Sequence, residues 1–184
     1  MRGDRVPNRL LRDLFSLEGR VAVVTGATGV LGGAMARGLA RAGAKIGVLG
    51  RRRERAEQVA REISVLGGEA AAVPADVLDE EQLRGVRDAV LGRWGRLDVL
   101  VNAAGGNVPG ATLRGDETVF DLPREFFVEV FDLNLVGTVL PIQVLGEAIT
   151  RGAGGASSTC LPWRPRGRSP GWRATRRRRW RWTT

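Results

Sequence analysis

Short apolar runs alternate with longer amphipathic stretches over residues 20–102. The apolar runs have the length of strands and occupy residues 21–24, 44–49, 69–76 and 97–102. The stretches between them have helical spacing of apolar positions and occupy residues 31–42, 52–66 and 79–94. Uninterrupted apolar runs favour strands that are buried on both faces. Alternating strands and helices predict a parallel sheet with right-handed crossovers and helices on both faces.

A glycine-rich turn separates the first predicted strand from the first predicted helix. Gly26, Gly29 and Gly32 recur there at every third position. Glycines let the backbone approach a pyrophosphate closely, and the N-terminus of the following helix presents N–H donors. Strand, glycine turn and helix in this order favour a nucleotide-binding site. A plain glycine turn between a strand and a helix satisfies the same pattern and is the alternative.

The last predicted element is a long helix over residues 123–151. Its apolar positions mostly follow helical spacing and include Phe126, Phe127, Val130, Phe131, Leu135, Val139, Ile142, Val144 and Leu145. An apolar face this wide needs a sheet to cover it. Earlier in the chain, Asp79 is expected to cap the helix that it precedes. We expect no segment to be long and apolar enough to span a membrane.

Basic residues are unevenly distributed along the chain. The whole chain has 29 Lys and Arg against 20 Asp and Glu, which gives a formal net charge of +9. Residues 154–184 contain nine Arg, no acidic residue and four of the five Trp, so the excess charge lies there. This change in composition marks a boundary after residue 153. We therefore expect an Arg/Trp-rich tail (154–184) after a nucleotide-binding domain (16–153), which an N-terminal extension (1–15) precedes. Low complexity favours disorder of the tail in isolation.

Cysteine content and the N-terminal residues bear on the cellular compartment. Cys160 is the only cysteine, so no internal disulfide can form. A single cysteine fits a reducing compartment. Residues 1–13 are charged and lack the apolar core of a signal peptide. We therefore expect a cytoplasmic protein, and we expect no metal site.

Several motifs, in the right order, resemble the short-chain dehydrogenase/reductase family. They are Thr25-Gly26-x-x-Gly29-x-x-Gly32, Asp76 after the third strand, Asn102-Ala103-Ala104-Gly105 after the fourth strand, and Asn134 in the long helix. The chain departs from the family's common branch at Val30, where that branch has glycine. Together with residues 105–109, the pattern resembles sugar-acid oxidoreductases of the mannonate/fructuronate type.

The resemblance implies an α/β fold, namely an incomplete doubly wound parallel sheet that is Rossmann-like and has strand order 3-2-1-4. It also implies a dinucleotide site at the carboxyl ends of the strands. The residues carried over to that site are Gly26, Thr28, Gly29, Val30, Leu31, Gly32, Arg51, Arg52, Asp76, Val77, Asn102, Ala103, Ala104 and Gly105. In the intact family, the substrate is a small-molecule carbonyl or alcohol and the enzyme is a homo-oligomer.

The reaction implied by the family is hydride transfer between a nicotinamide and a carbonyl or alcohol carbon. The family uses a Tyr as acid/base, a Lys that lowers the pKa of that Tyr, a Ser and an Asn. This chain has no Tyr and no His, and its only Lys is Lys45 in the second strand. Asn134 is the one catalytic residue carried over. We therefore expect the cofactor half of an NAD(P)-dependent oxidoreductase, inactive alone, with a nucleotide-binding pseudoenzyme as the alternative.

The residues after the second strand bear on cofactor choice. An acid at that position would bind the ribose 2′-OH and select NAD. The chain instead has Gly50 followed by Arg51 and Arg52. A guanidinium can pair with a 2′-phosphate in a bidentate way. We therefore expect NADP to be preferred over NAD, the alternative being that these arginines form the solvated first turn of a helix.

The tail over residues 154–184 is expected to result from out-of-frame translation. In the family, a fifth strand and the catalytic Ser follow the long helix, whereas no apolar run follows residue 155 here. Synonymous codons for residues 156–184, read in a shifted frame, can encode such a strand, a Ser and Tyr-x-x-x-Lys. The alternatives are a nucleic-acid arm or a membrane-surface segment. We expect no specific nucleic acid and no membrane as partners.

Overall fold

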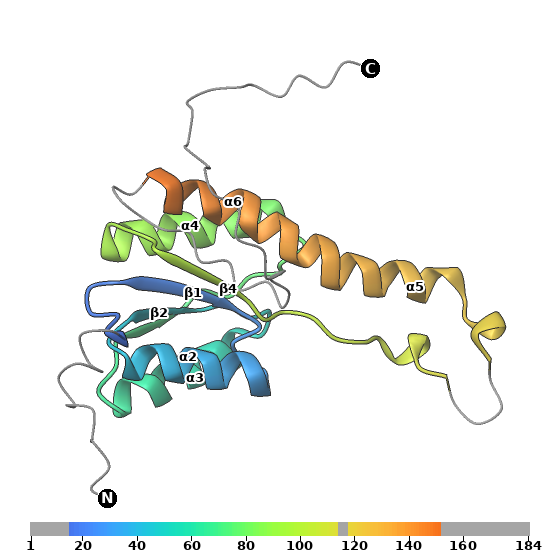
Figure 1. The fold of residues 1–184 in the computed structure, drawn as a ribbon, viewed down its shortest axis with the longest axis horizontal. Helices are drawn as coiled ribbons and strands as arrows, with labels where there is room; N and C mark the ends of the chain where they lie inside the picture. Colours follow the sequence, from blue (N-terminus) through green and yellow to red (C-terminus); the bar gives the residue numbers. More distant parts are fainter. Residues whose placement is uncertain (1–14, 114–117, 152–184) are drawn as a thin grey trace, which may run out of the picture.

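The computed structural model describes residues 15–113 and 118–151 (Figure 1). Residues 1–14, 114–117 and 152–184 lie outside the described residues. The predictions made for the N-terminal extension and for the Arg/Trp-rich tail therefore stay predictions.

A parallel four-stranded sheet lies at the centre, in the order β3-β2-β1-β4. The strands are β1 (Val21–Thr25), β2 (Lys45–Val48), β3 (Ala70–Ala72) and β4 (Val99–Asn102). The register places Ala22 of β1 between Ile46 of β2 and Val99 of β4. The predicted strand order 3-2-1-4 and the parallel sheet are therefore confirmed.

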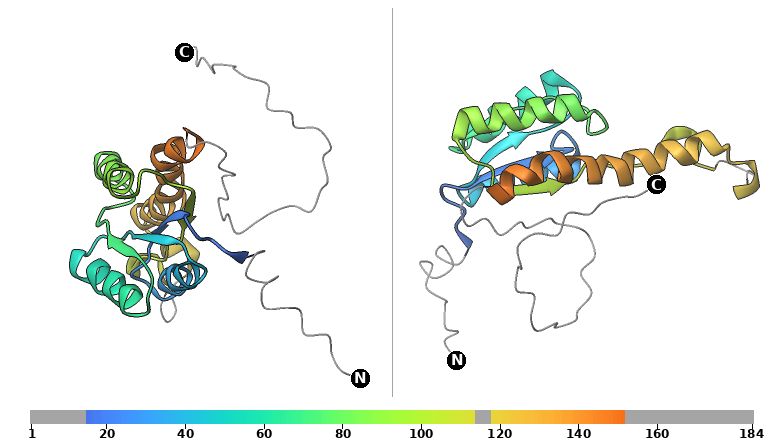
Figure 2. Two further views of the ribbon diagram at one scale, coloured as in Figure 1. Left: turned by 90° about the vertical axis from the view of Figure 1, so that its left-hand side faces the viewer. Right: turned by 90° about the horizontal axis from the view of Figure 1, so that it is seen from above.

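Helices cover both faces of the sheet (Figures 1 and 2). One face carries α2 (Val30–Arg41) and α3 (Arg53–Val65), and the other carries α4 (Glu80–Trp94) and α6 (Gly137–Arg151). Successive strand residues point to opposite faces. Val21 and Val23 accordingly pack in the cluster with α4 and α6, whereas Ala22 and Val24 pack in the cluster with α2 and α3. Burial on both faces explains the unbroken apolar run in β1.

The third strand is shorter than the predicted range of residues 69–76, because β3 spans only Ala70–Ala72. Hydrogen bonds to the β2 side continue past its end, from Val73 N–H to the Val48 carbonyl at 3.0 Å and from Ala75 N–H to the Gly50 carbonyl at 3.3 Å. Pro74, between these two residues, has no N–H to continue the ladder. Asp76 therefore follows an irregular segment rather than the strand itself.

The predicted helix cap at Asp79 is confirmed. Its carboxylate accepts a hydrogen bond from the Gln82 N–H at 3.0 Å, and α4 begins at the next residue, Glu80. This hydrogen bond lowers the pKa of Asp79. The cap also orders the loop next to Asp76, because the Gln82 side chain accepts a hydrogen bond from the Asp76 N–H at 2.9 Å.

A buried carboxylate joins the amino ends of β1 and β4. Asp98 is 6% exposed and accepts hydrogen bonds from Val21 N–H at 2.9 Å, Arg20 at 3.0 Å and Arg96 Nε at 2.8 Å. Burial raises the pKa of Asp98, but the hydrogen bonds from Arg96, Val21 and Arg20 outweigh burial and hold that pKa below its usual range. The amino ends of the two central strands are thus fixed by charge-assisted bonds.

The long helix forms as predicted but contains a π-helical turn. α5 (Arg124–Phe131) continues through η3 (Asp132–Val136) into α6. α6 has six buried residues, whereas α5 and η3 have none. Figure 1 shows α5 projecting beyond the sheet, beside the short 3₁₀ helices η1 (Pro109–Ala111) and η2 (Val119–Asp121). The sheet therefore covers only the C-terminal half of the predicted apolar face.

The expectation that no segment could span a membrane is wrong on length and composition. The continuous helix Arg124–Arg151 has 28 residues and is long and apolar enough to do so. Its residues 133–150 contain one charged residue, Glu147. Core helices of soluble proteins can meet the same criterion, and α6 packs its buried residues against the sheet and α4. This criterion is therefore weak evidence for a membrane.

Candidate functional site

A pocket of about 230 Å³ lies at the carboxyl ends of β1, β2 and β4. Its lining comes from the glycine turn, the segments after β2, β3 and β4, and η3: Gly26, Thr28, Gly29, Leu49, Gly50, Arg51, Ala75, Asp76, Val77, Ala103, Ala104, Gly105 and Leu133. In open α/β sheets, ligands bind outside the carboxyl ends of the strands, where the strand order reverses. Here the chain crosses from β3 to β4 on the other side of β1, so the pocket lies at that point.

Most of the predicted cofactor residues meet at this pocket. Those that line it are Gly26, Thr28, Gly29, Arg51, Asp76, Val77, Ala103, Ala104 and Gly105. Val30 and Leu31 lie beside it at the start of α2 and are 87% and 72% exposed. Arg52 is the exposed N-cap residue of α3. Gly32 lies in the first turn of α2 against the Gly26 carbonyl, Asn102 ends β4, and Asn134 lies in η3.

Four lining residues were not among the predicted cofactor-binding residues, although Gly50 was singled out as the position that lacks an acid. Leu49, Gly50 and Ala75 adjoin predicted positions at the ends of β2 and β3, so proximity to strand ends could have identified them. Leu133 comes from η3, about 30 residues after β4. No local pattern marks Leu133, because the course of the long helix brings it to the pocket.

The glycine turn is pressed between the end of β4 and the first turn of α2. Gly26 has φ +63°, and a Cβ at this residue would lie 2.5 Å from the Ala103 carbonyl oxygen. A Cβ on Gly32 would overlap the Gly26 carbonyl oxygen. No side chain caps α2, and its first turn has no acidic residue. The first N–H groups of α2 are therefore available to an anion, which fits the pyrophosphate of a dinucleotide.

Thr25 fastens the loop after β4 to the end of β1. Its side-chain oxygen accepts hydrogen bonds from the Ala103 and Ala104 N–H groups, each at 3.0 Å, and the residue is fully buried. Next to this loop, the side-chain oxygen and nitrogen of Asn102 are buried without a hydrogen-bond partner among the described residues. An unpaired buried amide costs about 1–3 kcal/mol. The end of β4 therefore carries polar groups that its present neighbours do not satisfy.

A carboxylate and a guanidinium line the same pocket. One oxygen of Asp76 accepts the Leu78 N–H at 3.0 Å, which fixes the carboxylate in its loop. Arg51 lies on the pocket wall and forms no ion pair with any residue of the described ranges. The pocket therefore offers an acceptor on one segment and an unpaired cation on another.

Asn134 joins the long helix to the loop after β4. Its side-chain nitrogen donates to the carbonyls of Gly106 at 2.7 Å and Val130 at 2.8 Å, and its side-chain oxygen accepts the Gly106 N–H at 3.0 Å. A Cβ on Gly105 would lie 2.8 Å from that oxygen. The Thr138 hydroxyl donates to the Asn134 carbonyl at 2.9 Å. The amide of Asn134 thus holds the loop edge of the pocket in place.

Lys45 lies at the wrong end of the sheet to contribute to this site. It begins β2, whereas the pocket adjoins the carboxyl end of that strand. Its ammonium pairs with Glu69 at 3.0 Å. Hydrogen bonds from Trp94 and from Lys45 lower the pKa of Glu69. This cluster of charges stabilises the amino ends of β2 and β3.

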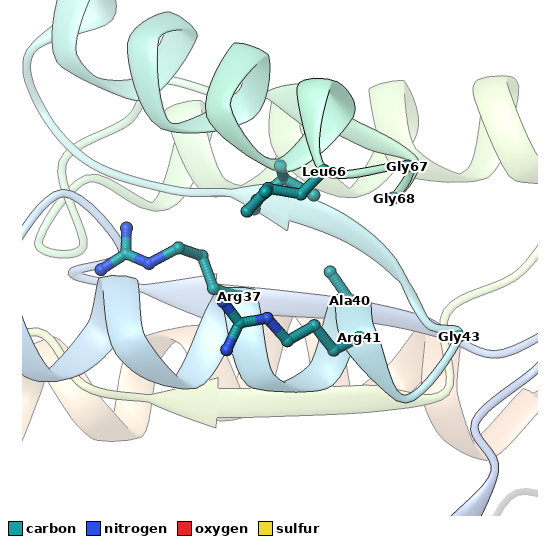
Figure 3. A pocket seen from close by; sticks show the side chains of 8 residues that line it. Arg37, Ala40, Arg41, Gly43, Leu66, Gly67 and Gly68 are labelled. Atoms are coloured by element: carbon teal, nitrogen blue, oxygen red, sulfur yellow. The ribbon is translucent and has the colours of Figure 1, made fainter.

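A second hollow, of about 310 Å³, lies between the C-terminal ends of α2 and α3 (Figure 3). Arg37 and Arg41 line it together with the apolar side chains of Ala40, Ile63 and Leu66. Arg37 already pairs with Glu62 at 3.5 Å. Helix C-termini present carbonyl oxygens rather than N–H groups. This hollow therefore lacks the free backbone N–H groups that the glycine turn offers to a pyrophosphate, although the guanidinium groups of Arg37 and Arg41 line it.

Comparisons with known proteins agree with the geometry of the site. A sequence profile of the family described as short chain dehydrogenase matches residues 20–156. An uncharacterized oxidoreductase of Bacillus subtilis, UxuB, is 40% identical over 144 residues, which cover 74% of this chain and 52% of the relative.

Solved structures show the same likeness. A candidate D-mannonate oxidoreductase of Haemophilus influenzae with bound NAD is 36% identical with a TM-score of 0.69, over 76% of this chain and 53% of that chain. A 7α-hydroxysteroid dehydrogenase in complex with NADH and 7-oxo glycochenodeoxycholic acid is 31% identical with a TM-score of 0.70, over 80% of this chain and 55% of that chain. The chain thus spans about half the length of the relatives that it matches.

Proposed function

This chain belongs to the short-chain dehydrogenase/reductase family, and from that premise we propose that its pocket binds a nicotinamide dinucleotide, with NADP preferred over NAD. One observation carries this proposal. The glycine turn, with Gly26 at φ +63°, leaves the N–H groups of α2 uncapped at the edge of a pocket at the strand ends. Close backbone approach and free N–H donors are what a pyrophosphate requires.

Each group of lining residues would contact a different part of the dinucleotide. The first turn of α2, after Gly29, would hold the pyrophosphate. The free oxygen of Asp76 would accept a hydrogen bond from the adenine amino group, beside Val77. Asn102, Ala103, Ala104 and Gly105 would form the wall next to the nicotinamide ribose. The nicotinamide itself supplies hydride transfer when the dinucleotide is bound.

The preference for NADP rests on the end of β2. Gly50 offers no carboxylate for a ribose 2′-OH, and Arg51 on the pocket wall is unpaired within the described ranges. A guanidinium binds a 2′-phosphate more strongly than a 2′-hydroxyl, because charge and bidentate geometry both contribute. The two solved relatives described above hold NAD and NADH, so on this proposal the chain differs from them in cofactor.

We propose cofactor binding without hydride transfer by this chain alone. The likeness to a candidate D-mannonate oxidoreductase supports a carbonyl or alcohol of a sugar acid as the family substrate. Of the family's catalytic set, the chain has Asn134, whereas Tyr is absent from the sequence and Lys45 lies at the other end of β2. Proton transfer by a positioned side chain typically contributes about 10²–10⁴-fold to rate. We also propose that the chain is cytoplasmic and that copies of it associate with one another.

Titration of the 184-residue chain with NADPH and NADH, by isothermal calorimetry, tests the proposal. We expect NADPH to bind at least about tenfold more tightly, a difference of about 1.4 kcal/mol. The double variant Arg51→Gln/Arg52→Gln should remove that difference. Arg61→Gln is the matched control, because Arg61 is an exposed arginine of α3 that pairs with Glu57 away from the pocket.

Three results would contradict the proposal. Equal or tighter binding of NADH would overturn the NADP preference, and binding of neither dinucleotide by folded protein would overturn the cofactor site. Reduction of NADP by D-mannonate with this chain alone would overturn the statement that it does not transfer hydride.

A further inference from the structure

The neighbouring Thr28 side chain, and not the backbone conformation, favours glycine at position 50. Gly50 is buried at the end of β2 and is not among the glycines with positive φ. A Cβ placed on it would lie 2.7 Å from Cγ2 and 2.8 Å from Oγ1 of Thr28. Real Cβ atoms do not come this close to other heavy atoms. The φ of Gly50 would thus suit a residue with a side chain, but the Thr28 side chain occupies the space that this side chain would need.

A hydrogen bond in the glycine turn places Thr28 over Gly50. The Ala27 N–H donates to the Leu49 carbonyl at 3.1 Å. Ala27 precedes Thr28 and Leu49 precedes Gly50, so this bond holds Thr28 next to Gly50. Thr28 is β-branched, so two heavy atoms on its Cβ face the same space and its χ1 is restricted. Thr28, Gly50 and Arg51 all line the pocket. The contact between Thr28 and Gly50 therefore lies inside the proposed binding site.

We propose that Thr28 sets the cofactor preference of this chain by excluding a side chain from position 50. A carboxylate at the end of β2 would bind a ribose 2′-OH and repel a 2′-phosphate. A carboxylate at position 50 would have to displace the Thr28 side chain, so the guanidinium of Arg51 is the charged group on that wall. This inference rests on the proposed dinucleotide site and assigns its selectivity to a residue of the glycine turn.

A double-mutant cycle in the full chain tests the steric part of the inference without any ligand. The cycle uses Gly50→Ala, Thr28→Ala and the two together, with thermal melting as the readout. Gly50→Ala should lower the melting temperature in the presence of Thr28 and should lower it far less in the Thr28→Ala background. Gly38→Ala is the matched control, because nothing lies within 4 Å of a Cβ at Gly38. An equal penalty for Gly50→Ala in both backgrounds would overturn the inference.

A second cycle tests selectivity by calorimetric binding of NADH and NADPH. Gly50→Asp alone should weaken binding of both dinucleotides, because the new side chain must displace Thr28 from the pocket wall. Thr28→Ala/Gly50→Asp should bind NADH at least about tenfold more tightly than Gly50→Asp does, and should prefer NADH to NADPH.

The outcomes separate this inference from the proposed function. If the unmodified chain binds NADPH but Gly50→Asp alone already prefers NADH with an unchanged melting temperature, Thr28 is not the determinant and the dinucleotide site stands. If the folded chain binds neither dinucleotide, the proposed function fails and the selectivity assigned to Thr28 fails with it.

Discussion

The sheet region and the projecting region of this molecule have similar apolar content but different surroundings. The sheet region comprises β1–β4 with α2, α3, α4 and α6, and the projecting region comprises η1, η2, α5 and η3. Val23 in β1 is fully buried, whereas Phe120, Phe127 and Phe131 of the projecting region are 93%, 55% and 54% exposed. Apolar composition alone therefore did not decide burial. A side chain is buried here only where a second layer of structure lies over it.

The long helix passes through both regions, and the burial of its apolar side chains differs between them. Leu145 in α6 is fully buried against the sheet and α4, and Phe131 in α5 is more than half exposed. Phe127, Phe131 and Leu135 are exposed and recur at every fourth residue, so they share one face of the helix. An exposed apolar face commonly marks a surface that binds another protein element. The projecting region is thus the part of the described chain whose packing is incomplete.

Truncation of one apolar residue in each region should give the largest difference. Leu145→Ala should lower the free energy of unfolding by about 2–5 kcal/mol, since a fully buried Leu leaves a cavity. Phe131→Ala should cost less than about 1 kcal/mol, because its ring is more than half exposed and pairs with the exposed ring of Phe127, at 5.5 Å between centroids. Urea denaturation of both variants measures this, and similar losses would show that α5 is covered in solution.

Removal of the buried charge in the sheet region should have the next largest effect. Asp98→Asn should cost about 1–3 kcal/mol at pH 7, because the buried side chain loses its charge-assisted hydrogen bonds to Arg20 and Arg96, whose own guanidinium groups remain half exposed. The pKa of Asp98 is lowered in the folded state, so its contribution is complete above the unfolded pKa of about 3.9 and is lost as pH falls through the folded pKa.

The difference in stability between unmodified chain and Asp98→Asn should therefore narrow below about pH 4. Urea denaturation at pH 7 and at several acidic pH values tests this expectation. Arg84→Gln, at an exposed pair with Glu80, serves as a control for general charge effects. A constant difference across this pH range would contradict the assigned role of Asp98.

Glycine-to-alanine substitutions at a packed and at an open position of α2 should have opposite effects on stability. Gly32→Ala should cost about 1–3 kcal/mol and abolish dinucleotide binding, since the new Cβ would overlap the Gly26 carbonyl oxygen. Gly38→Ala should stabilise the chain by about 1 kcal/mol, because nothing surrounds its Cβ and Ala is the better helix former. Thermal melts and calorimetry report both effects. Intact binding in Gly32→Ala would argue against the assigned turn.

The junction between the two regions should show a smaller effect. Asn134→Ala removes the three side-chain hydrogen bonds that join η3 to Gly106 and Val130, and should cost about 1 kcal/mol. Hydrogen exchange at the Gly106 amide should accelerate, while exchange in β1 stays unchanged. Thr138→Val removes only a hydroxyl bond to the Asn134 carbonyl and is the control. Unchanged exchange at Gly106 would show that Asn134 does not hold the loop.

Polar substitution on the projecting helix should have the smallest effect on stability. Phe127→Ser/Phe131→Ser should change the free energy of unfolding by about 1 kcal/mol or less, because both rings are largely exposed. The same change should weaken self-association, which sedimentation velocity measures at several protein concentrations. An unchanged sedimentation profile in an associating chain would place the association surface elsewhere.

Much of the sheet region followed from local pattern. Alternating apolar runs and amphipathic stretches led to the parallel sheet with helices on both faces. The strand order 3-2-1-4 came from the resemblance to the family and is confirmed. The spacing of Gly26, Gly29 and Gly32 marked the turn that lines the pocket or packs beneath it. The cap at Asp79 followed from its position before an amphipathic stretch. These features depend on residues that are near one another in the chain.

Other features were decided by contacts between distant segments. The π turn at η3, the entry of Leu133 into the pocket and the requirement for a small residue at Gly50 have no local signature. The extent of burial along the long helix was also not readable, because apolar periodicity shows which face prefers cover and not whether another layer reaches it. The sequence by itself determined the strands, helices, turns and their order. Only the tertiary structure decided which atoms share space, since steric exclusion such as that of Thr28 over Gly50 arises when segments 22 residues apart meet.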